Sequence, residues 1–329
     1  MYTWSTDQVD PRDRFDYWRE VRAKGLFGVT AELEPEQRQN FFGAFSLRKL
    51  GNAGLIELRA SPYRVERRAG DIANARSDSL CIYQQLGGGG WFSGARLAEF
   101  SVRNGMFATS HADLPYRTAP LGADGFHLRI IKVPVADIPR PNVRLDEFVP
   151  KPVQAQGALL PLLESCFQDL VEGSDSAVSS SLSALTQALA HFALIDRGVM
   201  RSTSRLARQA LRTGRLSLAR RLIERHLSRA ALSPTLVADM LGISVRHMHI
   251  LFETTAMSFS HTVTALRIER SRRLLRAAPE QPIAEVAYAC GFESLATFYR
   301  VFNAAEGMTP GDYRAARRTE DKATSPADR

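Results

Sequence analysis

The sequence contains little cysteine and no long apolar run. Its three cysteines, Cys81, Cys166 and Cys290, lie far apart and form neither a CxxC pair nor a zinc-site spacing. We therefore expect a reduced, cytoplasmic protein. No apolar stretch approaches the length needed to span a bilayer, and the first residues lack the basic start and apolar core of a secretory signal. These absences argue against a membrane or secreted protein.

Lysine is nearly absent from the last third of the chain, yet that third carries the positive charge. Residues 1–200 hold 22 Lys and Arg against 23 Asp and Glu, a net charge of −1. Residues 201–329 hold 21 against 12, a net charge of +9, and all but one of the 21 are arginine. A basic, arginine-rich module suits phosphate binding, although a solvated basic surface would have the same composition.

One short pattern occurs twice in this basic region. The first copy is residues 237–243 and the second is residues 286–292. Each has a small residue at its second position and a glycine at its sixth, followed by an apolar residue. Gly242 and Gly291 fit the end of a helix, where a residue without a Cβ takes a positive φ at little cost. Each copy therefore predicts a helix that ends in a tight turn.

A second predicted helix follows each turn. Ser244 and Ser294 suit its N-cap, and the apolar residues after them recur at helical spacing. Two helix-turn-helix units result, at about 234–253 and 282–303. A single such pattern is weak evidence, because many helical hairpins have a glycine at the corner. Two copies in one small domain indicate a tandem DNA-binding domain.

Residues 218–314 resemble the DNA-binding domain of the AraC/XylS family of transcription regulators. The segments that carry the resemblance are residues 237–244, 257–259, 267–270, 283–294, 298–302 and 307–314. The resemblance implies a DNA-binding regulator, an activator rather than a repressor, that works with RNA polymerase.

The candidate DNA contacts lie on the two predicted recognition helices. They are Ser244, Arg246, His249, Ile250, Ser294, Leu295, Ala296, Thr297, Tyr299 and Arg300. The two arginines suit bidentate contacts to guanine, and the apolar members suit thymine methyl groups. The hydroxyls and the N–H groups of the first turn suit phosphates. A solvated helix face is the alternative for each residue.

The N-terminal half has the pattern of a small β-barrel or sandwich after an initial helix at 11–21. Short strands are expected at residues 44–50, 55–60, 79–85, 99–102, 106–109 and 126–133. Residues 103–105 (Arg-Asn-Gly) predict a hairpin corner. This half resembles the cupin-like sensor domain of one branch of the same family, through residues 15–20, 70–71, 104–107 and 115–116.

A pocket in such a barrel would be lined by apolar and aromatic side chains with a few polar groups. The candidates are Tyr83, Trp91, Phe107, His111, Tyr116 and Phe126. Each could equally be an ordinary core residue. His111 and His127 stand alone, with no His-x-His pattern, so we expect no metal.

A proline-rich segment at 134–152 predicts a boundary, and helices at about 157–171 and 176–200 follow. They could pack on the barrel or form a dimer interface. Residues 201–215 are expected to be a polar, basic linker. A helix at 217–228 would then open the DNA-binding domain, and a helix at about 260–277 would join its two units.

The predicted fold is an α+β multidomain chain. It has a cupin-like effector-sensing β-barrel (1–150), a helical linker and dimerisation region (151–205), an all-α tandem helix-turn-helix domain (215–316) and a disordered tail (318–329). The expected partners are double-stranded DNA, RNA polymerase, a second copy of the chain and a small-molecule effector of unknown identity.

An enzyme fused to a DNA reader is the alternative class. A cysteine-dependent repair methyltransferase would need a Pro-Cys-His type motif or a zinc-binding cysteine cluster. Cys81 and Cys166 have neither, and Cys290 falls in a helix-turn-helix corner. A cupin metalloenzyme would need the missing metal ligands. We therefore expect no enzyme activity and no cofactor.

Overall fold

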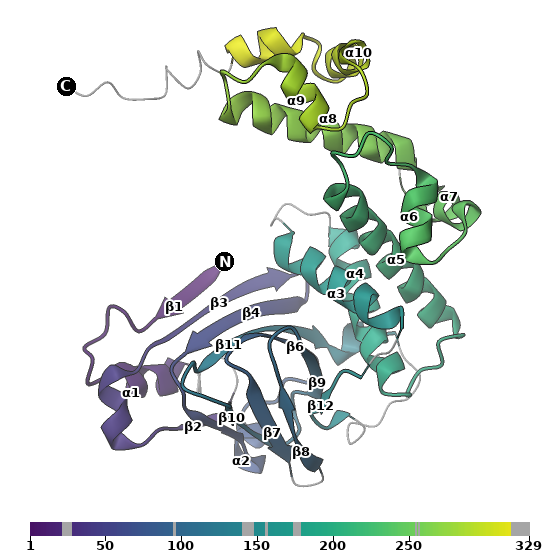
Figure 1. The fold of residues 1–329 in the computed structure, drawn as a ribbon. Helices are drawn as coiled ribbons and strands as arrows, with labels where there is room; N and C mark the ends of the chain where they lie inside the picture. The colour runs from purple at the N-terminus through teal and green to yellow at the C-terminus, as the bar shows by residue number, and fades with distance from the viewer. Residues whose placement is uncertain are drawn as a thin grey trace, which may run out of the picture. The chain divides into compact units, whose positions relative to one another are not determined.

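The chain forms two compact units, Met1–Gly214 and Arg215–Arg329. The first combines β-sheets with helices and the second is helical (Figure 1), which confirms the predicted α+β multidomain class. The computed structural model describes residues 1–21, 28–94, 97–139, 148–154, 157–173, 179–253, 255 and 257–316. The predicted tail at 318–329 lies outside these residues.

Two antiparallel sheets make up most of the first unit. In spatial order, the seven-stranded sheet contains β1 (Tyr2–Ser5), β3 (Gly43–Leu50), β4 (Ala53–Ala60), β11 (Phe126–Pro134), β6 (Ser79–Gly87), β9 (Phe107–His111) and β12 (Lys151–Pro152). The five-stranded sheet contains β2 (Thr30–Glu32), β5 (Arg64–Arg67), β10 (Tyr116–Pro120), β7 (Gly90–Gly94) and β8 (Leu97–Val102). All six predicted strands are present. The sheets do not close into one barrel, so the sandwich alternative is correct.

The core lies between the two sheets. On β11, Phe126, Leu128 and Ile130 face the same interior, as period-two alternation requires. They pack with Val65 of β5 in the opposite sheet. Burial of these side chains between the sheets stabilises the sandwich.

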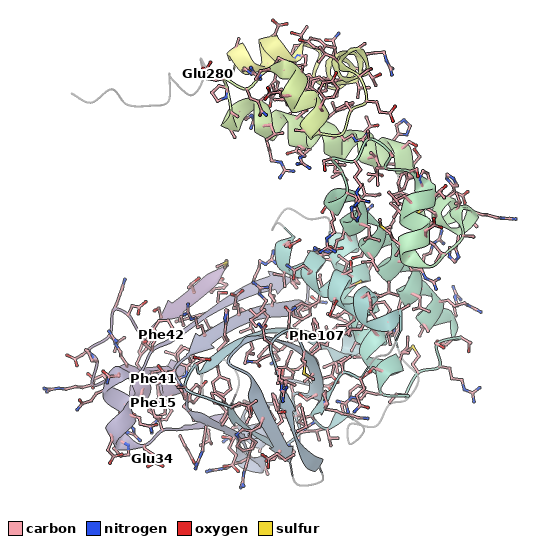
Figure 2. All side chains as sticks on the ribbon, in the orientation of Figure 1. Phe15, Glu34, Phe41, Phe42, Phe107 and Glu280 are labelled. Atoms are coloured by element: carbon pink, nitrogen blue, oxygen red, sulfur yellow. The ribbon has the colours of Figure 1, made fainter. Side chains whose placement is uncertain are left out.

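An aromatic cluster anchors helix α1 (Arg14–Arg19) to one end of this core. The ring centroids of Phe15 and Phe41 lie 5.2 Å apart in an edge arrangement, and those of Trp18 and Tyr63 lie 6.4 Å apart. Figure 2 labels Phe15 and Phe41 beside α1. The other short helical segments of the unit are η2 (Pro35–Asn40), α2 (Ala69–Asn74) and η3 (Val135–Asp137).

The corner at residues 103–105 is a turn, but the hairpin prediction is wrong. Met106 N–H donates to the Arg103 carbonyl at 2.9 Å, which closes the turn. The strand before it, β8, pairs with β7 in the five-stranded sheet, and the strand after it, β9, pairs with β6 and β12 in the other. The turn therefore carries the chain from one sheet to the other.

Helices α3 (Leu159–Glu172) and α4 (Ser179–Asp196) pack against the seven-stranded sheet (Figure 1). The rings of Phe107 on β9 and Phe167 on α3 lie 5.2 Å apart at their centroids. After α4, the Arg197 guanidinium donates to the carbonyls of Thr109 at 2.6 Å and Val149 at 2.7 Å. Burial lowers the pKa of Arg197 to about 10. These contacts bear out the packing role of the two helices, and a role in dimerisation stays a prediction.

The predicted linker at 201–215 is wrong in its second part, because α5 runs without a break from Arg205 to Arg225. Arginine, leucine and alanine are good helix formers. Ala207, Ala210 and Gly214 recur at helical spacing, and the two alanines are fully buried. A Cβ on Gly214 would lie 2.6 Å from the Phe192 ring, so the small residues allow close packing on α4.

The second unit consists of short helices assembled on one long one. They are α6 (Pro234–Leu241), α7 (Val245–Glu253), α8 (Phe259–Ala277), α9 (Ile283–Ala289) and α10 (Leu295–Glu306), after the end of α5. Across the described ranges, no helix has both the length and the apolar character needed to cross a membrane.

Candidate nucleic-acid interface and ligand pocket

The two helix-turn-helix corners have the same backbone geometry. The corner glycine has a φ of +64° between α6 and α7 and of +87° between α9 and α10. The next residue then donates to a carbonyl five residues back. Ile243 N–H bonds to the Ala238 carbonyl at 3.0 Å, and Phe292 N–H bonds to the Ala287 carbonyl at 3.1 Å. This is the left-handed glycine cap that ends a helix sharply.

Serine caps the second helix of each helix-turn-helix, as predicted. The Ser244 hydroxyl accepts from the His247 N–H and the Ser294 hydroxyl accepts from the Thr297 N–H, both at 3.2 Å. The other N–H groups of each first turn have no helical acceptor and favour an anion. A proline stands at the start of the first helix in each pair: Pro234 is the first residue of α6, and Pro282 is the N-cap of α9.

Buried residues fix which face of each second helix points outward. The inward residues are Met248, Leu251, Phe252, Phe298 and Phe302, each at most 2% exposed. The opposite faces hold most of the candidate DNA contacts. The exposed ones are Ser244, Arg246, His249, Ile250, Ala296, Thr297, Tyr299 and Arg300. Ser294 and Leu295 are partly buried, and Leu295 packs on the second core.

Arginines of the second unit differ in their partners. Within the described part of the chain, neither Arg246 nor Arg300 forms a salt bridge, so both guanidinium groups face solvent with their charge uncompensated. By contrast, Arg272 on α8 pairs with Glu306 at 2.9 Å, and Arg276 donates to the Tyr313 hydroxyl at 2.6 Å. Arg246 on α7 and Arg300 on α10 are therefore placed to meet an external anion.

Helix α8 belongs to both cores of the second unit. Phe259 and Val263 pack with α6 and α7, whereas Ile268 and Leu275 pack with α9 and α10. Helices α7 and α10 are thus held by opposite halves of one helix. Arg267, in the middle of α8, also contacts the chain far from its own helix, at the carbonyls of Leu227 and Arg229, and the sequence pattern around it does not predict these contacts.

A cavity of about 50 Å³ lies between the two sheets of the first unit. Three of the six candidate pocket residues line it, namely Tyr83, Tyr116 and Phe126. The Tyr83 hydroxyl is within 3.0 Å of the Ser110 hydroxyl on the neighbouring strand β9. Burial raises the pKa of Tyr83 well above its ordinary value, so this hydroxyl keeps its proton.

The other three candidates lie elsewhere. Trp91 borders a separate hollow beside Arg117, and Phe107 packs on α3. His111 is 1% exposed; its Nδ1 accepts from the Asp113 N–H at 3.0 Å, and its Nε2 lies 3.1 Å from an Asp78 carboxylate oxygen. Because Nδ1 accepts, Nε2 carries the proton of the neutral ring. His111 therefore connects β9 to Asp78, just before β6, and to Asp113, just after β9.

Two basic side chains that the sequence analysis did not single out also line the cavity, Arg67 and Lys132. A signal for Lys132 was present in the sequence. The alternation of β11 places residues 126, 128, 130 and 132 on one face, and the last of these is a lysine. Among the described residues, no three His, Cys, Asp or Glu side chains gather in a way that could hold a metal ion.

The second unit matches known transcription regulators in sequence. Residues 237–316 match a family model described as "Helix-turn-helix domain". The HTH-type transcriptional regulator GlxA of Rhizobium meliloti (strain 1021) is 40% identical over 93 residues, which are 28% of this chain and 27% of that protein. The transcriptional activator NphR of a Rhodococcus species is 31% identical over 103 residues, 31% of this chain and 30% of that protein.

A solved structure resembles most of the chain. The AraC-like transcriptional activator CuxR matches with a TM-score of 0.51 and 18% identity, over 85% of this chain and 95% of that one. At that identity the likeness concerns the fold alone. The matches to GlxA and NphR span less than a third of those proteins. Residues 237–316, within the second unit, form a helix-turn-helix domain similar to those of these regulators.

Proposed function

We propose that this chain is a ligand-responsive regulator of transcription that reads specific DNA sequences with its second unit. The observation that carries the proposal is the pair α7 and α10. Both follow the same glycine corner, both are held by α8, and both present an exposed arginine. Two such helices can enter successive major-groove segments about one helical turn, roughly 34 Å, apart.

The exposed faces suggest how each helix reads DNA. Arg246 and Arg300 suit bidentate contacts to guanine O6 and N7. His249 and Tyr299 suit base edges or phosphates, and Ile250 suits a thymine methyl group. Leu295 and Ala296 also suit thymine methyl groups. Phosphates suit Ser244, Ser294 and Thr297, and the two serines can contact a phosphate while they cap their helices.

The first unit supplies the response to a ligand in this proposal. Its intersheet cavity would take a small-molecule effector, and α3 and α4 would form the contact between two copies of the chain. Activation rather than repression is supported by the names of NphR and CuxR, which are called activators. RNA polymerase is the partner that an activator requires, and the cytoplasm is where both would meet.

Genome-wide capture of DNA with the purified full-length protein tests the proposal, followed by a salt titration on the best fragment. A recurring bipartite site with a steep loss of affinity in rising salt is expected. The double variant Arg246→Ala/Arg300→Ala is the control and should enrich no sequence. If the wild-type protein also enriches none, with or without added effector candidates, the chain is not a sequence-specific regulator.

A further inference from the structure

A hollow of about 480 Å³ lies on the outer face of the five-stranded sheet, separate from the cavity of about 50 Å³ between the sheets. Its volume is within the range of small-molecule sites. The side chains that define its chemistry are Glu32, Arg64, Glu66, Arg68, Trp91 and Arg117. They belong to four neighbouring strands, β2, β5, β10 and β7, apart from Arg68, which directly follows β5. The sheet therefore fixes their spacing.

Alternation along the strands places these side chains outside the core. Val65 of β5 and Phe92 of β7 are buried between the sheets. The neighbouring Arg64 and Trp91 therefore point to the opposite face. On β10, which lies between these two strands, Ala119 is the cross-strand partner of Trp91. A methyl group at this position leaves the space beside the indole ring open.

Four of the five charged side chains in the hollow neutralise one another. Arg117 donates to Glu66 at 2.7 Å, and Arg68 pairs with Glu66 at 2.6 Å and with Glu32 at 2.7 Å. Hydrogen bonds from Arg117 and Arg68 lower the pKa of Glu66, so this carboxylate stays ionised. Two arginines and two glutamates are therefore already balanced within the protein.

Arg64 carries the fifth charge. It is exposed, and within the described ranges its guanidinium has no hydrogen bond and no ion pair. Its cross-strand neighbour Glu32 pairs with Arg68 instead. The hollow therefore has one net positive charge, on Arg64. A guanidinium has parallel N–H donors that match the two oxygens of a carboxylate.

Trp91 supplies an aromatic wall. Its backbone is held in place, because the Trp91 carbonyl accepts from the Thr118 hydroxyl at 2.7 Å. Its side chain is half-buried. In the part of the chain that the structure describes, no other aromatic ring stacks on the indole, and the indole N–H has no acceptor. An indole face favours a planar ring as its neighbour.

We propose that the outer face of the five-stranded sheet binds an aromatic carboxylate, with its ring stacked on Trp91 and its carboxylate paired with Arg64. One negative charge matches the one net positive charge of the hollow. A phosphate monoester carries nearly two negative charges at neutral pH, so part of its charge would have no partner there. The inference goes beyond the proposed function, because neither Trp91 nor Arg64 lines the intersheet cavity or belongs to α7 or α10.

Isothermal titration calorimetry of the full-length protein, without DNA, tests the proposal with probes that separate the ring from the charge. Benzoate and phenylacetate have both, benzamide and phenylacetamide lack the charge, and cyclohexanecarboxylate lacks the aromatic ring. At least one of the two aromatic acids should bind. Its amide and cyclohexanecarboxylate should each bind about tenfold more weakly or worse, because each loses one of the two contacts.

Variants at Arg64 locate the carboxylate. Arg64→Met should weaken binding of the acid about tenfold or more and leave the weak amide binding unchanged, because only the charged contact is lost. Arg64→Lys should restore part of the affinity. Arg59→Met is the matched control, because Arg59 is an exposed arginine on β4 in the other sheet and does not line the hollow. Circular dichroism verifies that each variant is folded.

Tryptophan fluorescence locates the ring. Trp18 is buried and Trp4 stacks on Phe45 with ring centroids 4.7 Å apart, whereas Trp91 lines the hollow. A bound acid should therefore change the fluorescence of the wild-type protein. Trp91→Phe should abolish this change while calorimetry still detects binding, and Trp91→Leu should weaken the binding of acid and amide alike.

Four results would each overturn the inference: equal binding of the acid and its amide, wild-type affinity in Arg64→Met, a fluorescence change that persists in Trp91→Phe, or no binding of either aromatic acid. The DNA capture described above is independent of this titration. A protein that reads a specific site but binds no aromatic acid lacks this ligand site and keeps the proposed function. One that binds the acid at Arg64 but no specific DNA does the reverse.

Discussion

The Arg267 guanidinium, in the middle of α8, donates to the Arg229 carbonyl at 2.8 Å, 38 residues earlier in the chain. It also donates to the Leu227 carbonyl at 3.3 Å and lies 5.8 Å from the centroid of the Phe292 ring. Leu227 belongs to the first helix-turn-helix core and Phe292 to the second. One side chain therefore links the segment just after α5 to the corner of the second helix-turn-helix.

Replacement of Arg267 by methionine should loosen the spacing of the two recognition helices without unfolding either core. We expect binding to a bipartite site to fall about tenfold, because the preorganisation of the two helices is lost, while binding to each half-site changes little. Gel-shift titrations with full and half sites measure both quantities.

Arg273→Met is the control for this change. It removes a charge from the same helix, but the Arg273 side chain is 72% exposed, and its ion-pair distance to Glu269 is 4.0 Å. If Arg267→Met and Arg273→Met weaken binding equally at full and half sites, Arg267 contributes only charge.

The sequence predicted the features that depend on local patterns. The repeated glycine corners, the capping serines and the inward residues of α7 and α10 follow from residues within a few positions of each other. The six predicted strands could be identified because apolar residues alternate along them. Strands such as β5 were missed because Arg67 occupies an inward position, which conceals the alternation.

What the sequence could not predict depends on partners far along the chain. The turn at 103–105 is local, but whether its strands pair with each other depends on which sheet each one joins. Phe107 and Tyr83 are both aromatic strand residues, yet one faces α3 and the other the cavity. From the sequence alone, Arg267 is one of several arginines on a helix, and only the fold shows that it contacts Leu227.

The two corner glycines provide a matched pair for stability. Both have positive φ, but a Cβ on Gly242 would meet nothing within 4 Å, whereas a Cβ on Gly291 would lie 2.3 Å from the Leu227 carbonyl. Gly242→Ala should cost about 1 kcal/mol from backbone strain alone. Gly291→Ala should cost roughly 3 kcal/mol, because steric overlap adds to the strain.

Urea unfolding followed by two signals measures the difference. Circular dichroism reports helices of both units, whereas tryptophan fluorescence reports the first unit alone and should not shift in either variant. Equal losses of unfolding free energy in the two variants would mean that the backbone at Leu227 shifts to make room for the new methyl group.

The cysteines should be unreactive in the folded protein. Cys81, Cys166 and Cys290 are all buried, and burial raises the pKa of Cys290 to about 11. Thiolate is the reactive form, so little of it exists at pH 8. A thiol reagent such as DTNB should label no cysteine rapidly in the native chain and three after unfolding. One rapidly labelled native cysteine would contradict this.

The same pKa shift predicts how stability depends on pH. The raised pKa means that the folded chain holds the Cys290 proton more tightly than the unfolded chain does. The contribution of this shift to the free energy of unfolding is therefore complete below about pH 9 and is lost as the pH rises from 9 towards 11. Cys290→Ala should reduce this loss in urea unfolding curves measured at pH 8 to 10.5, relative to the wild-type protein.

The recognition arginines allow base reading to be separated from charge. Arg246→Ala or Arg300→Ala should cost about 1–3 kcal/mol at the preferred site and relax the sequence preference at one position, in different halves of the site. The affinity for unrelated DNA should fall much less. Arg208→Ala is the control, because Arg208 is an exposed arginine on α5 within the first unit.

Binding selection from randomised DNA, carried out for each variant, resolves the two roles. A guanine preference lost in only one half of the site assigns that half to the mutated helix and fixes the orientation of α7 and α10 on the duplex. A loss that is equal on all sequences, with a salt slope reduced by about one, would instead show that both arginines contact phosphates. Specificity would then depend on the apolar contacts of Ile250 and Ala296 and on the shape of the DNA.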